Sequence, residues 1–376
     1  MKVMVVKDRN VLNTKFLTQF VNSLAEVGHE VHVVCDSYNK QGKGAELSGK
    51  VKFTNLNAKT KNPLINVFRF CREKFFIPCF RYKKFIKKEK PDVIICYFMN
   101  DLFNVSFMQK HNIPIIMMMH CYPSIIFGKI KKKPFFLRGI YQKIVENVAV
   151  FQVLMKSHAS VLSKYYKVKK IVDIPNAVEQ IPTGNRADLS IEKKKIIYVA
   201  RVEKEGKRQH LIIEAFAKIA EKFPEWVVEF WGLQKYKKYN EELMNLAQKY
   251  DIEKNIYIMG YSNNIQEVYK DADFQVFPSL HEGFGLGLAD GMAMGLPSIG
   301  FVDTPSVNEL IITGHNGYLV KDVEELAEKM EVLMGNKALR IDMGEKAAKD
   351  MEKYDPRLVT EAWDKLIKET VMGRLK

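Results

Sequence analysis

Short apolar runs alternate along the first half of the chain with segments whose apolar residues recur every three or four positions. Residues 2–6, KVMVV, predict a buried strand, and residues 14–28 predict an amphipathic helix that stops at Gly28. Further strands are predicted at 29–35, 91–96 and 113–119. Alternation of this kind is typical of a parallel, doubly wound sheet.

The same alternation begins again in the second half. Residues 196–200 predict a strand, and residues 210–224 predict a helix. Further strands are predicted at 227–232, 255–260 and 274–279, and further helices at 241–251 and 265–272. Between the halves, residues 171–195 are rich in proline and turn-forming residues and lack a long periodicity, so we predict a linker there.

We therefore predict an α/β protein with two Rossmann-like domains that face each other across a cleft. The first domain spans residues 1–178 and the second spans 179–354, and a last helix at 355–376 could pack on either of them. A chain of 376 residues is long enough for two such cores. Ligands of open parallel sheets bind outside the carboxyl ends of the strands, so we expect the functional site there.

Composition excludes several classes of protein. With 47% hydrophobic and 27% charged residues, the chain is globular and not disordered. Its apolar runs at 93–99 and 113–119 are far shorter than the ~20 residues of a membrane-spanning helix. The N-terminal residues do not resemble a signal peptide, and the five cysteines are odd in number and form no C-x-x-C pair. We expect a cytoplasmic protein with reduced thiols and no zinc site.

The positive charge is concentrated in the first half. Residues 1–180 hold 31 Lys and Arg against 12 Asp and Glu, whereas the remainder holds 28 against 32. Such asymmetry indicates that the first half meets an anionic partner, either nucleic acid or an acidic membrane surface.

The segment at residues 62–90 is the most basic and aromatic part of that half. It carries nine Lys and Arg, two glutamates and seven aromatic residues. Interleaved cations and aromatic rings suit a helix in a membrane interface, although the same composition could serve RNA or two ordinary solvated helices, and Pro78 would kink a continuous helix. We favour docking on an anionic membrane surface and expect the protein to be peripheral on the inner face of the cell membrane.

The loop that follows the strand at 196–200 is a candidate anion site. Arg201 and Lys207 flank this loop, which leads into a helix near Gln209. A guanidinium fork, an ammonium group and a helix N-terminus together suit a diphosphate. The alternative is a solvated loop in a lysine-rich protein.

Residues 281–300, HEGFGLGLADGMAMGLPSIG, combine helical spacing with glycines at 283, 285, 287 and 291, which disfavour a helix. Glycine lets backbone N–H groups approach a ligand closely, and the carboxylates of Glu282 and Asp290 can accept hydrogen bonds from sugar or ribose hydroxyls. The alternative is a glycine-rich packing helix with two exposed acids.

Residues 278–300 resemble the E-x7-E region of retaining glycosyltransferases of family 4, with EGFG at Glu282 and then GMAMGLP. The resemblance extends to IPNAVE at 174–179, to YVARV followed by GK at 198–207, and to VNELIITGHNGYLV at 307–320. It is dense over the second half and loose over the first. It implies the GT-B fold, a nucleotide-diphosphate sugar as the donor and no further cofactor.

Roles follow from the resemblance, residue by residue. Arg201 and Lys207 hold the donor diphosphate, and Glu282 contacts the donor sugar hydroxyls. Asp290 takes the ribose hydroxyls, and His120, which directly follows the strand at 113–119, matches the family's histidine near the donor sugar. The resemblance also places the backbone N–H groups of Phe284, Gly285 and Leu286 near the donor sugar and its phosphate. A lone histidine at a strand end can equally be structural.

Three departures from the family pattern stand out. Asp290 is an aspartate where the family has glutamate, and alanines stand at positions 177 and 200, where glycine is common. The loop at 7–15 also lacks the glycine pair that the family often has after its first strand.

We expect no metal at the site. Residues 271–273, DAD, match a bare D-x-D motif, which binds a metal in another transferase fold, but Asp273 comes directly before a strand, where family 4 also has an acid. The chain has no clustered Cys and His ligand set either.

The predicted function is a retaining glycosyltransferase (a hexosyltransferase). It would move a hexose or N-acetylhexosamine from a nucleotide-diphosphate sugar, UDP being favoured, to a lipid-linked or polymeric cell-surface glycan. One alternative is a GT-B-fold epimerase acting on a sugar nucleotide without an acceptor. A second alternative is a non-catalytic, basic protein that binds membranes or RNA. The presence of Arg201, Lys207 and Glu282 together disfavours this alternative. We do not expect nucleic acid as the partner.

Overall fold

The chain folds into two compact units, which are described separately. The computed structural model describes residues 1–7, 15–36, 47–57, 77–107, 112–234 and 236–373. Unit 1 comprises Met1–Asn176 and Arg357–Lys376, and unit 2 comprises Ala177–Pro356. The predicted loop at 7–15 and the predicted docking segment at 62–90 therefore lie partly outside the described residues, since 8–14 and 62–76 belong to the gaps.

Unit 1 is built on a seven-stranded sheet in the order β3-β2-β1-β4-β5-β6-β7, and all of its strand pairs are parallel. Its strands are β1 (Lys2–Val6), β2 (Glu30–Cys35), β3 (Lys52–Asn55), β4 (Val93–Cys96), β5 (Ile115–Met119), β6 (Val150–Val153) and β7 (Ile171–Asp173). Its helices are α1 (Lys15–Glu26), α3 (Ile77–Glu89), α4 (Met99–Ser106), α5 (Pro123–Lys131), α6 (Phe135–Glu146), α7 (Lys156–Ser163) and α16 (Pro356–Met372). The central strands are buried on both faces, which explains their unbroken apolar sequences.

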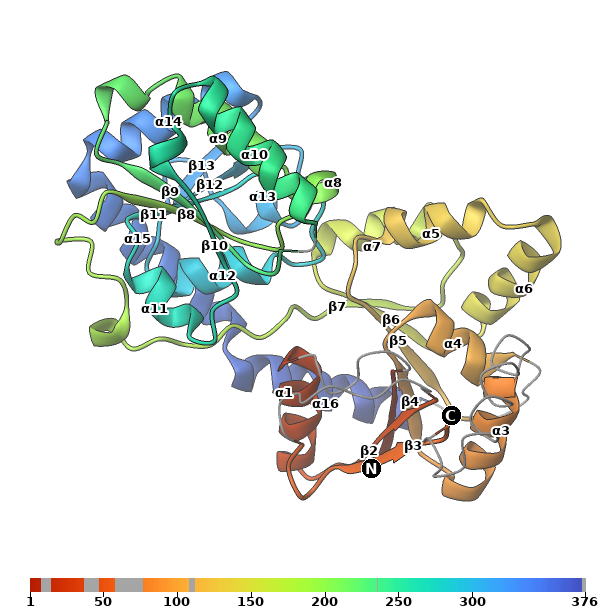
Figure 1. Ribbon diagram of the computed structural model, residues 1–376. Coiled ribbons are helices and arrows are strands. Elements are labelled where there is room, and N and C mark those ends of the chain that lie inside the picture. The colour runs from red at the N-terminus through yellow and green to blue at the C-terminus, as the bar shows by residue number, and fades with distance from the viewer. Residues whose placement is uncertain (8–14, 37–46, 58–76, 108–111, 235, 374–376) are drawn as a thin grey trace, which may run out of the picture. The chain divides into compact units, whose positions relative to one another are not determined.

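The C-terminal helix α16 packs in unit 1, beside α1 (Figure 1). The rings of Phe20 and Trp363 meet edge to face, with centroids 4.8 Å apart. Nearby, the Nε2 atom of His29 lies 2.9 Å from a carboxylate oxygen of Asp364. The last helix of the chain therefore completes the core of the first unit.

Unit 2 has a six-stranded parallel sheet in the order β10-β9-β8-β11-β12-β13. Its strands are β8 (Lys195–Val199), β9 (Val227–Trp231), β10 (Ile256–Gly260), β11 (Phe274–Phe277), β12 (Ser298–Phe301) and β13 (Gly317–Val320). Its helices are α8 (Lys204–Lys207), α9 (Gln209–Ala217), α10 (Lys237–Lys249), α11 (Ile265–Lys270), α12 (Leu286–Ala293), α13 (Val307–Leu310), α14 (Val323–Gly335) and α15 (Lys337–Asp350). Helices α9, α10 and α14 lie on one face of the sheet, with α11, α12 and α15 on the other (Figure 1).

Two parallel-sheet α/β domains are thus present, which confirms the predicted fold class. The predicted linker differs in one respect, because its first residues, Ile171–Asp173, form the edge strand β7 and pair with β6. No helix within the described residues is both long and apolar enough to cross a membrane.

Candidate functional site

The strands β8 and β11 are neighbours in the sheet of unit 2, so the loops after their carboxyl ends meet. Lys207, the last residue of the short helix α8 in the connection from β8 to α9, forms an ion pair with Glu282, from the loop after β11. Both side chains are only 14% exposed. The structure therefore brings together two residues that the sequence predicted as site residues 75 positions apart.

Two buried hydroxyls complete this cluster. The Nζ atom of Lys207 lies 3.5 Å from the Oγ atom of Ser279, which lies 2.7 Å from the hydroxyl oxygen of Tyr198. Burial, together with the nearby charge of Glu282, raises the pKa of Tyr198 well above its ordinary value, so its hydroxyl keeps its proton at neutral pH. No motif in the sequence pointed to either residue, although Ser279 is the last residue of the strand predicted at 274–279.

Arg201 lies on the same edge of the sheet, two residues after β8. Its side chain is 55% exposed, and its Nη2 atom lies 3.2 Å from the carboxylate of Glu203. The Nε2 atom of the buried Gln209 donates a hydrogen bond of 2.9 Å to the carbonyl oxygen of Arg201. The loop backbone is thus tied to the start of α9, while the guanidinium group reaches solvent.

The glycines of residues 281–300 have different causes. Gly285 precedes α12 with a φ of 89°, a left-handed conformation that favours glycine. A Cβ atom at Gly287 would lie 2.5 Å from the carbonyl oxygen of Val199, and one at Gly291 would overlap the side chain of Gln275. Gly287 and Gly291 therefore let α12 approach the sheet, so the packing alternative holds for these two positions.

The other predicted residues of this stretch lie at the start of α12. Phe284 is 2% exposed, and its ring packs edge to face on Tyr354 with centroids 5.2 Å apart. Leu286 is 37% exposed and begins the helix, and Asp290 lies one turn further on. Burial, and secondly the charge of Asp290, raises the pKa of Tyr269 well above its ordinary value, and the Tyr269 hydroxyl donates a hydrogen bond of 2.8 Å to the carbonyl oxygen of Gly287.

His120 belongs to unit 1, where it directly follows β5. Its ring stacks on Tyr97 with centroids 4.1 Å apart and meets Phe16 edge to face at 4.8 Å. Its Nε2 atom is shielded from solvent and has no hydrogen-bond partner among the described residues. Burial, and secondly the positive charge of Lys7, lowers the pKa of His120 to about 3, so the imidazole is neutral at physiological pH.

Lys7 is a further charged residue at this edge that the sequence analysis did not single out. It follows β1, is 2% exposed, and its Nζ atom lies 4.7 Å from the centroid of the Tyr97 ring. Burial lowers the pKa of Lys7 to about 8, although Asp101 opposes the shift. The sequence signal for Lys7 is its place directly after the apolar run VMVV, at the end of a predicted strand.

The D-x-D motif at 271–273 has a structural use. One carboxylate oxygen of the fully buried Asp273 accepts hydrogen bonds of 3.0 Å from the backbone N–H groups of Lys193 and Lys195. The side chain of Lys195 lies 2.6 Å from a carboxylate oxygen of Asp271. No group of three or more potential metal ligands occurs among the residues that the structure describes.

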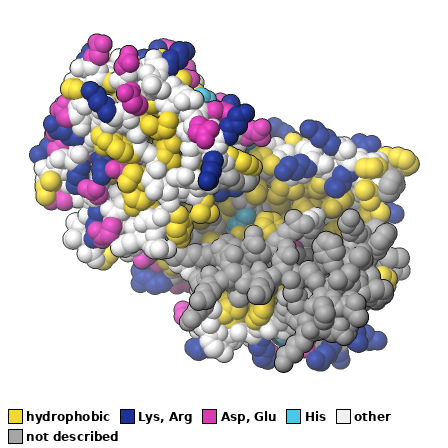
Figure 2. Space-filling view, viewed as in Figure 1, with side chains coloured by type: hydrophobic (Ala, Val, Ile, Leu, Met, Phe, Trp, Pro, Cys, Tyr) yellow, Lys and Arg dark blue, Asp and Glu magenta, His cyan; other side chains and the backbone are white. Residues whose placement is uncertain are grey.

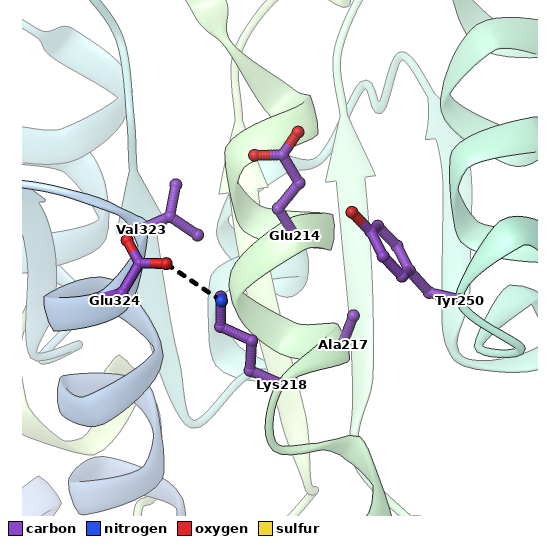
Figure 3. Close-up of a pocket in the computed structure, with 6 residues that line it drawn as sticks. All are labelled: Glu214, Ala217, Lys218, Tyr250, Val323 and Glu324. Carbon is purple, nitrogen blue, oxygen red and sulfur yellow. Dashed lines mark ion pairs between the residues drawn. The ribbon is translucent and has the colours of Figure 1, made fainter.

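A cavity of about 400 Å³ lies elsewhere in unit 2 and shares no residue with the predicted site (Figure 3). It is lined by Glu214, Ala217, Lys218, Tyr250, Val323 and Glu324. An ion pair of 3.0 Å between Lys218 and Glu324 joins α9 to α14 at its side (Figure 3). The cavity therefore lies between α9, the start of α14 and the residue that follows α10, away from the predicted site.

Comparison with known proteins gives a consistent result for both units. The family model described as Glycosyltransferase Family 4 matches residues 14–180, and the one described as Glycosyl transferases group 1 matches residues 184–350. Between them, the two matches cover almost all of the chain.

Two relatives illustrate the range of similarity. An uncharacterized glycosyltransferase of Haemophilus influenzae is 26% identical over 212 residues, which are 56% of this chain and 58% of the relative. The poly(ribitol-phosphate) alpha-N-acetylglucosaminyltransferase of Staphylococcus aureus is 24% identical over 223 residues, which are 58% of this chain and 39% of the relative. These matches thus span less than two thirds of either relative.

A crystal structure of a Staphylococcus aureus TarM variant in complex with Fondaparinux, alpha-GlcNAc-glycerol and UDP superposes with a TM-score of 0.74. The match covers 98% of this chain and 100% of that one at 15% identity, which establishes a shared fold. By its two matching domains and its fold, the chain belongs to the GT-B glycosyltransferases.

Proposed function

We propose that the protein is a retaining glycosyltransferase that moves a hexose or N-acetylhexosamine from a nucleotide-diphosphate sugar to a lipid-linked or polymeric cell-surface glycan. The cluster of Lys207, Ser279 and Glu282 supports this function most directly, because it places cationic and hydrogen-bonding groups at the carboxyl ends of β8 and β11. The TarM structure holds UDP, and the Staphylococcus aureus relative is named for a polymeric acceptor, so UDP-sugars and polyol-phosphate polymers are the first substrates to test.

In this proposal, unit 2 holds the donor. Arg201 and Lys207 bind the diphosphate and stabilise the charge that develops on it as the sugar departs. Glu282 accepts hydrogen bonds from the donor sugar, and Asp290 accepts them from the ribose. The backbone N–H groups of residues 284–286, at the start of α12, face the sugar and phosphate.

Unit 1 binds the acceptor and contributes His120. A neutral imidazole can exchange a hydrogen bond with a sugar hydroxyl without adding positive charge. No metal is assigned a role, because guanidinium and ammonium groups supply the charge. Full transfer in EDTA would agree with this assignment, and a loss that Mg²⁺ restores would contradict it.

We also propose that unit 1 docks on the anionic inner face of the cell membrane. Residues 102–145 contain seven Lys and Arg and no Asp or Glu. Where α5 meets α6, Lys131, Lys132 and Lys133 are exposed beside Phe135, which is 78% exposed. Figure 2 shows cationic and hydrophobic side chains together on this part of unit 1, an arrangement that suits an anionic lipid surface.

Incubation with a labelled UDP-sugar, with and without a poly(ribitol phosphate) or lipid-linked acceptor, tests the function. We expect acceptor-dependent transfer, with the new linkage in the anomeric configuration of the donor by NMR. Isomerised donor without an acceptor would identify an epimerase instead. A folded protein that neither binds nor consumes any of the UDP-, GDP- or ADP-sugars would indicate a non-catalytic protein.

A further inference from the structure

Arg208 is one of five non-glycine residues with a positive φ among the residues that the structure describes. It lies between α8 and α9 with φ 52° and ψ 37°, the left-handed region that glycine occupies most readily. A residue with a long side chain in this region costs about 1 kcal/mol or more relative to glycine. Contacts made by the Arg208 side chain can offset this cost.

The guanidinium group of Arg208 joins two loops at the proposed donor site. Its Nε atom donates a hydrogen bond of 2.5 Å to the carbonyl oxygen of Pro278, and its Nη2 atom donates one of 3.2 Å to that of Ser279. These carbonyls belong to the loop after β11, whereas Arg208 itself ends the loop after β8.

A third loop, the one after β12, also contacts the loop after β11. The hydroxyl of the buried Thr304, from the loop after β12, donates a hydrogen bond of 2.6 Å to the carbonyl oxygen of Ser279. The Arg208 guanidinium carbon lies 4.7 Å from the centroid of the Phe301 ring, which ends β12. The loop after β11 is thus held by Arg208 and Thr304 together.

We propose that Arg208 is a positioning residue that fixes the loop at 278–282, so that Ser279 and Glu282 meet Lys207 in the geometry that binds the donor. This role rests on the proposed function. Arg208 acts through its neighbours, because its fork binds main-chain carbonyls and its face covers Phe301. Lysine could not replace it, since one ammonium group cannot supply the same planar pair of donors or stack in the same way.

Two substitutions test the proposal by different means. Arg208→Gly removes the side chain and suits the left-handed backbone, so the variant should melt within a few degrees of the wild type. Arg208→Lys keeps the charge but loses the fork. In both, we expect the affinity for UDP to fall at least tenfold and amide hydrogen exchange to rise at Leu280, whose N–H donates to the carbonyl oxygen of Gly206 at 2.8 Å.

A double-mutant cycle separates positioning from general stability. If Arg208 acts through Lys207, then Arg208→Gly should change UDP affinity less than twofold in a Lys207→Ala background. Independent, multiplying losses would overturn the proposal, as would wild-type UDP affinity and wild-type exchange in either Arg208 variant. If the wild type does not bind UDP, the UDP assignment fails, while hydrogen exchange at Leu280 still decides the positioning role.

Discussion

At the scale of single residues, Lys207 and Glu282 are both proposed to contact the donor, yet they bind each other in this structure. An ammonium group shared with a carboxylate is less available to a diphosphate, because the donor must compete for it. The pair therefore holds both side chains in place and also sets a cost on nucleotide binding.

Removal of the carboxylate charge should separate these two effects. We predict that Glu282→Gln binds UDP about threefold to tenfold more tightly, because the glutamine oxygen still accepts a hydrogen bond that keeps Lys207 in position but no longer neutralises its charge. Sugar transfer should fall about 100-fold, since the charge of a sugar contact is lost. Calorimetry and a transfer assay measure the two quantities. Glu242→Gln is the matched control, because Glu242 pairs with the exposed Lys204 of the same loop. Weaker UDP binding by Glu282→Gln would show that the pair does not compete with the donor.

His120 gives a prediction that depends on pH. Its folded pKa, about 3, lies below the ordinary value of 6.5, so the unfolded state takes up the proton first as the pH falls. The wild type should therefore lose stability relative to His120→Gln as the pH falls below about 6.5, by at most about 1.4 kcal/mol per pH unit. Urea unfolding from pH 7 to pH 4.5 measures this difference. Parallel pH dependence in the two proteins would mean that His120 titrates normally.

At the scale of elements, helix α12 owes its glycines to the sheet beneath it. The Nε2 atom of the buried Gln275, in β11, donates a hydrogen bond of 2.9 Å to the carbonyl oxygen of Leu288 and another of the same length to the hydroxyl of Ser298. Helix and strands are therefore joined by polar contacts at close range. This proximity places the start of α12 beside the loop that carries Glu282.

Substitution of one of these glycines should disturb the packing. We predict that Gly287→Ala destabilises the fold by about 1–3 kcal/mol, since the added Cβ atom would meet the carbonyl oxygen of Val199 at 2.5 Å. Gly139→Ala in α6 is the control, because a Cβ atom there meets nothing within 4 Å. It should be neutral or stabilising by up to about 1 kcal/mol. Equal stability of the two variants in urea unfolding would contradict the close approach of α12.

Several elements could be predicted because their pattern is local. Buried parallel strands appear as short apolar runs. The strands β1, β4 and β5 therefore lie inside their predicted ranges, and β8 begins and ends one residue before its predicted range. The strand β3, with the sequence KFTN, offers one large apolar residue, and pairing with β2 makes it a strand. Likewise, β7 is set by its pairing with β6, which a local pattern does not reveal.

The site was predictable to a similar degree. Lys207 and Glu282 were found through motif resemblance, whereas Tyr198, Ser279 and Arg208 escaped because their importance comes from contacts between loops far apart in the sequence. The sequence leaves ligand approach and helix packing both open for the glycines at 287 and 291, because the atoms nearest to them belong to other elements. Spacing alone does not distinguish close approach to a ligand from close approach to a strand.

At the scale of the whole molecule, the basic surface of unit 1 predicts salt-sensitive membrane binding. Sedimentation with vesicles should be strong for anionic lipid, weak for zwitterionic lipid, and reduced by salt. A Lys131→Gln, Lys132→Gln, Lys133→Gln triple variant should bind anionic vesicles several-fold more weakly. The control, with the same change at Lys237, Lys238 and Lys254, alters exposed lysines of unit 2 and should bind normally. Equal binding to both lipid types would exclude electrostatic docking.

The central claim is that unit 2 binds a nucleotide-diphosphate sugar through Lys207. Thermal unfolding of the wild type, Lys207→Ala and the control Lys204→Ala, each with UDP, GDP, ADP and their sugars, tests it most directly. At a nucleotide concentration 100 times the dissociation constant, binding stabilises the folded state by about 2.7 kcal/mol. We predict that one nucleotide series raises the melting temperature of the wild type and of Lys204→Ala by several degrees, and that the rise is much smaller for Lys207→Ala, which binds the nucleotide more weakly. An equal rise in all three proteins, or no rise with any nucleotide, would contradict the account.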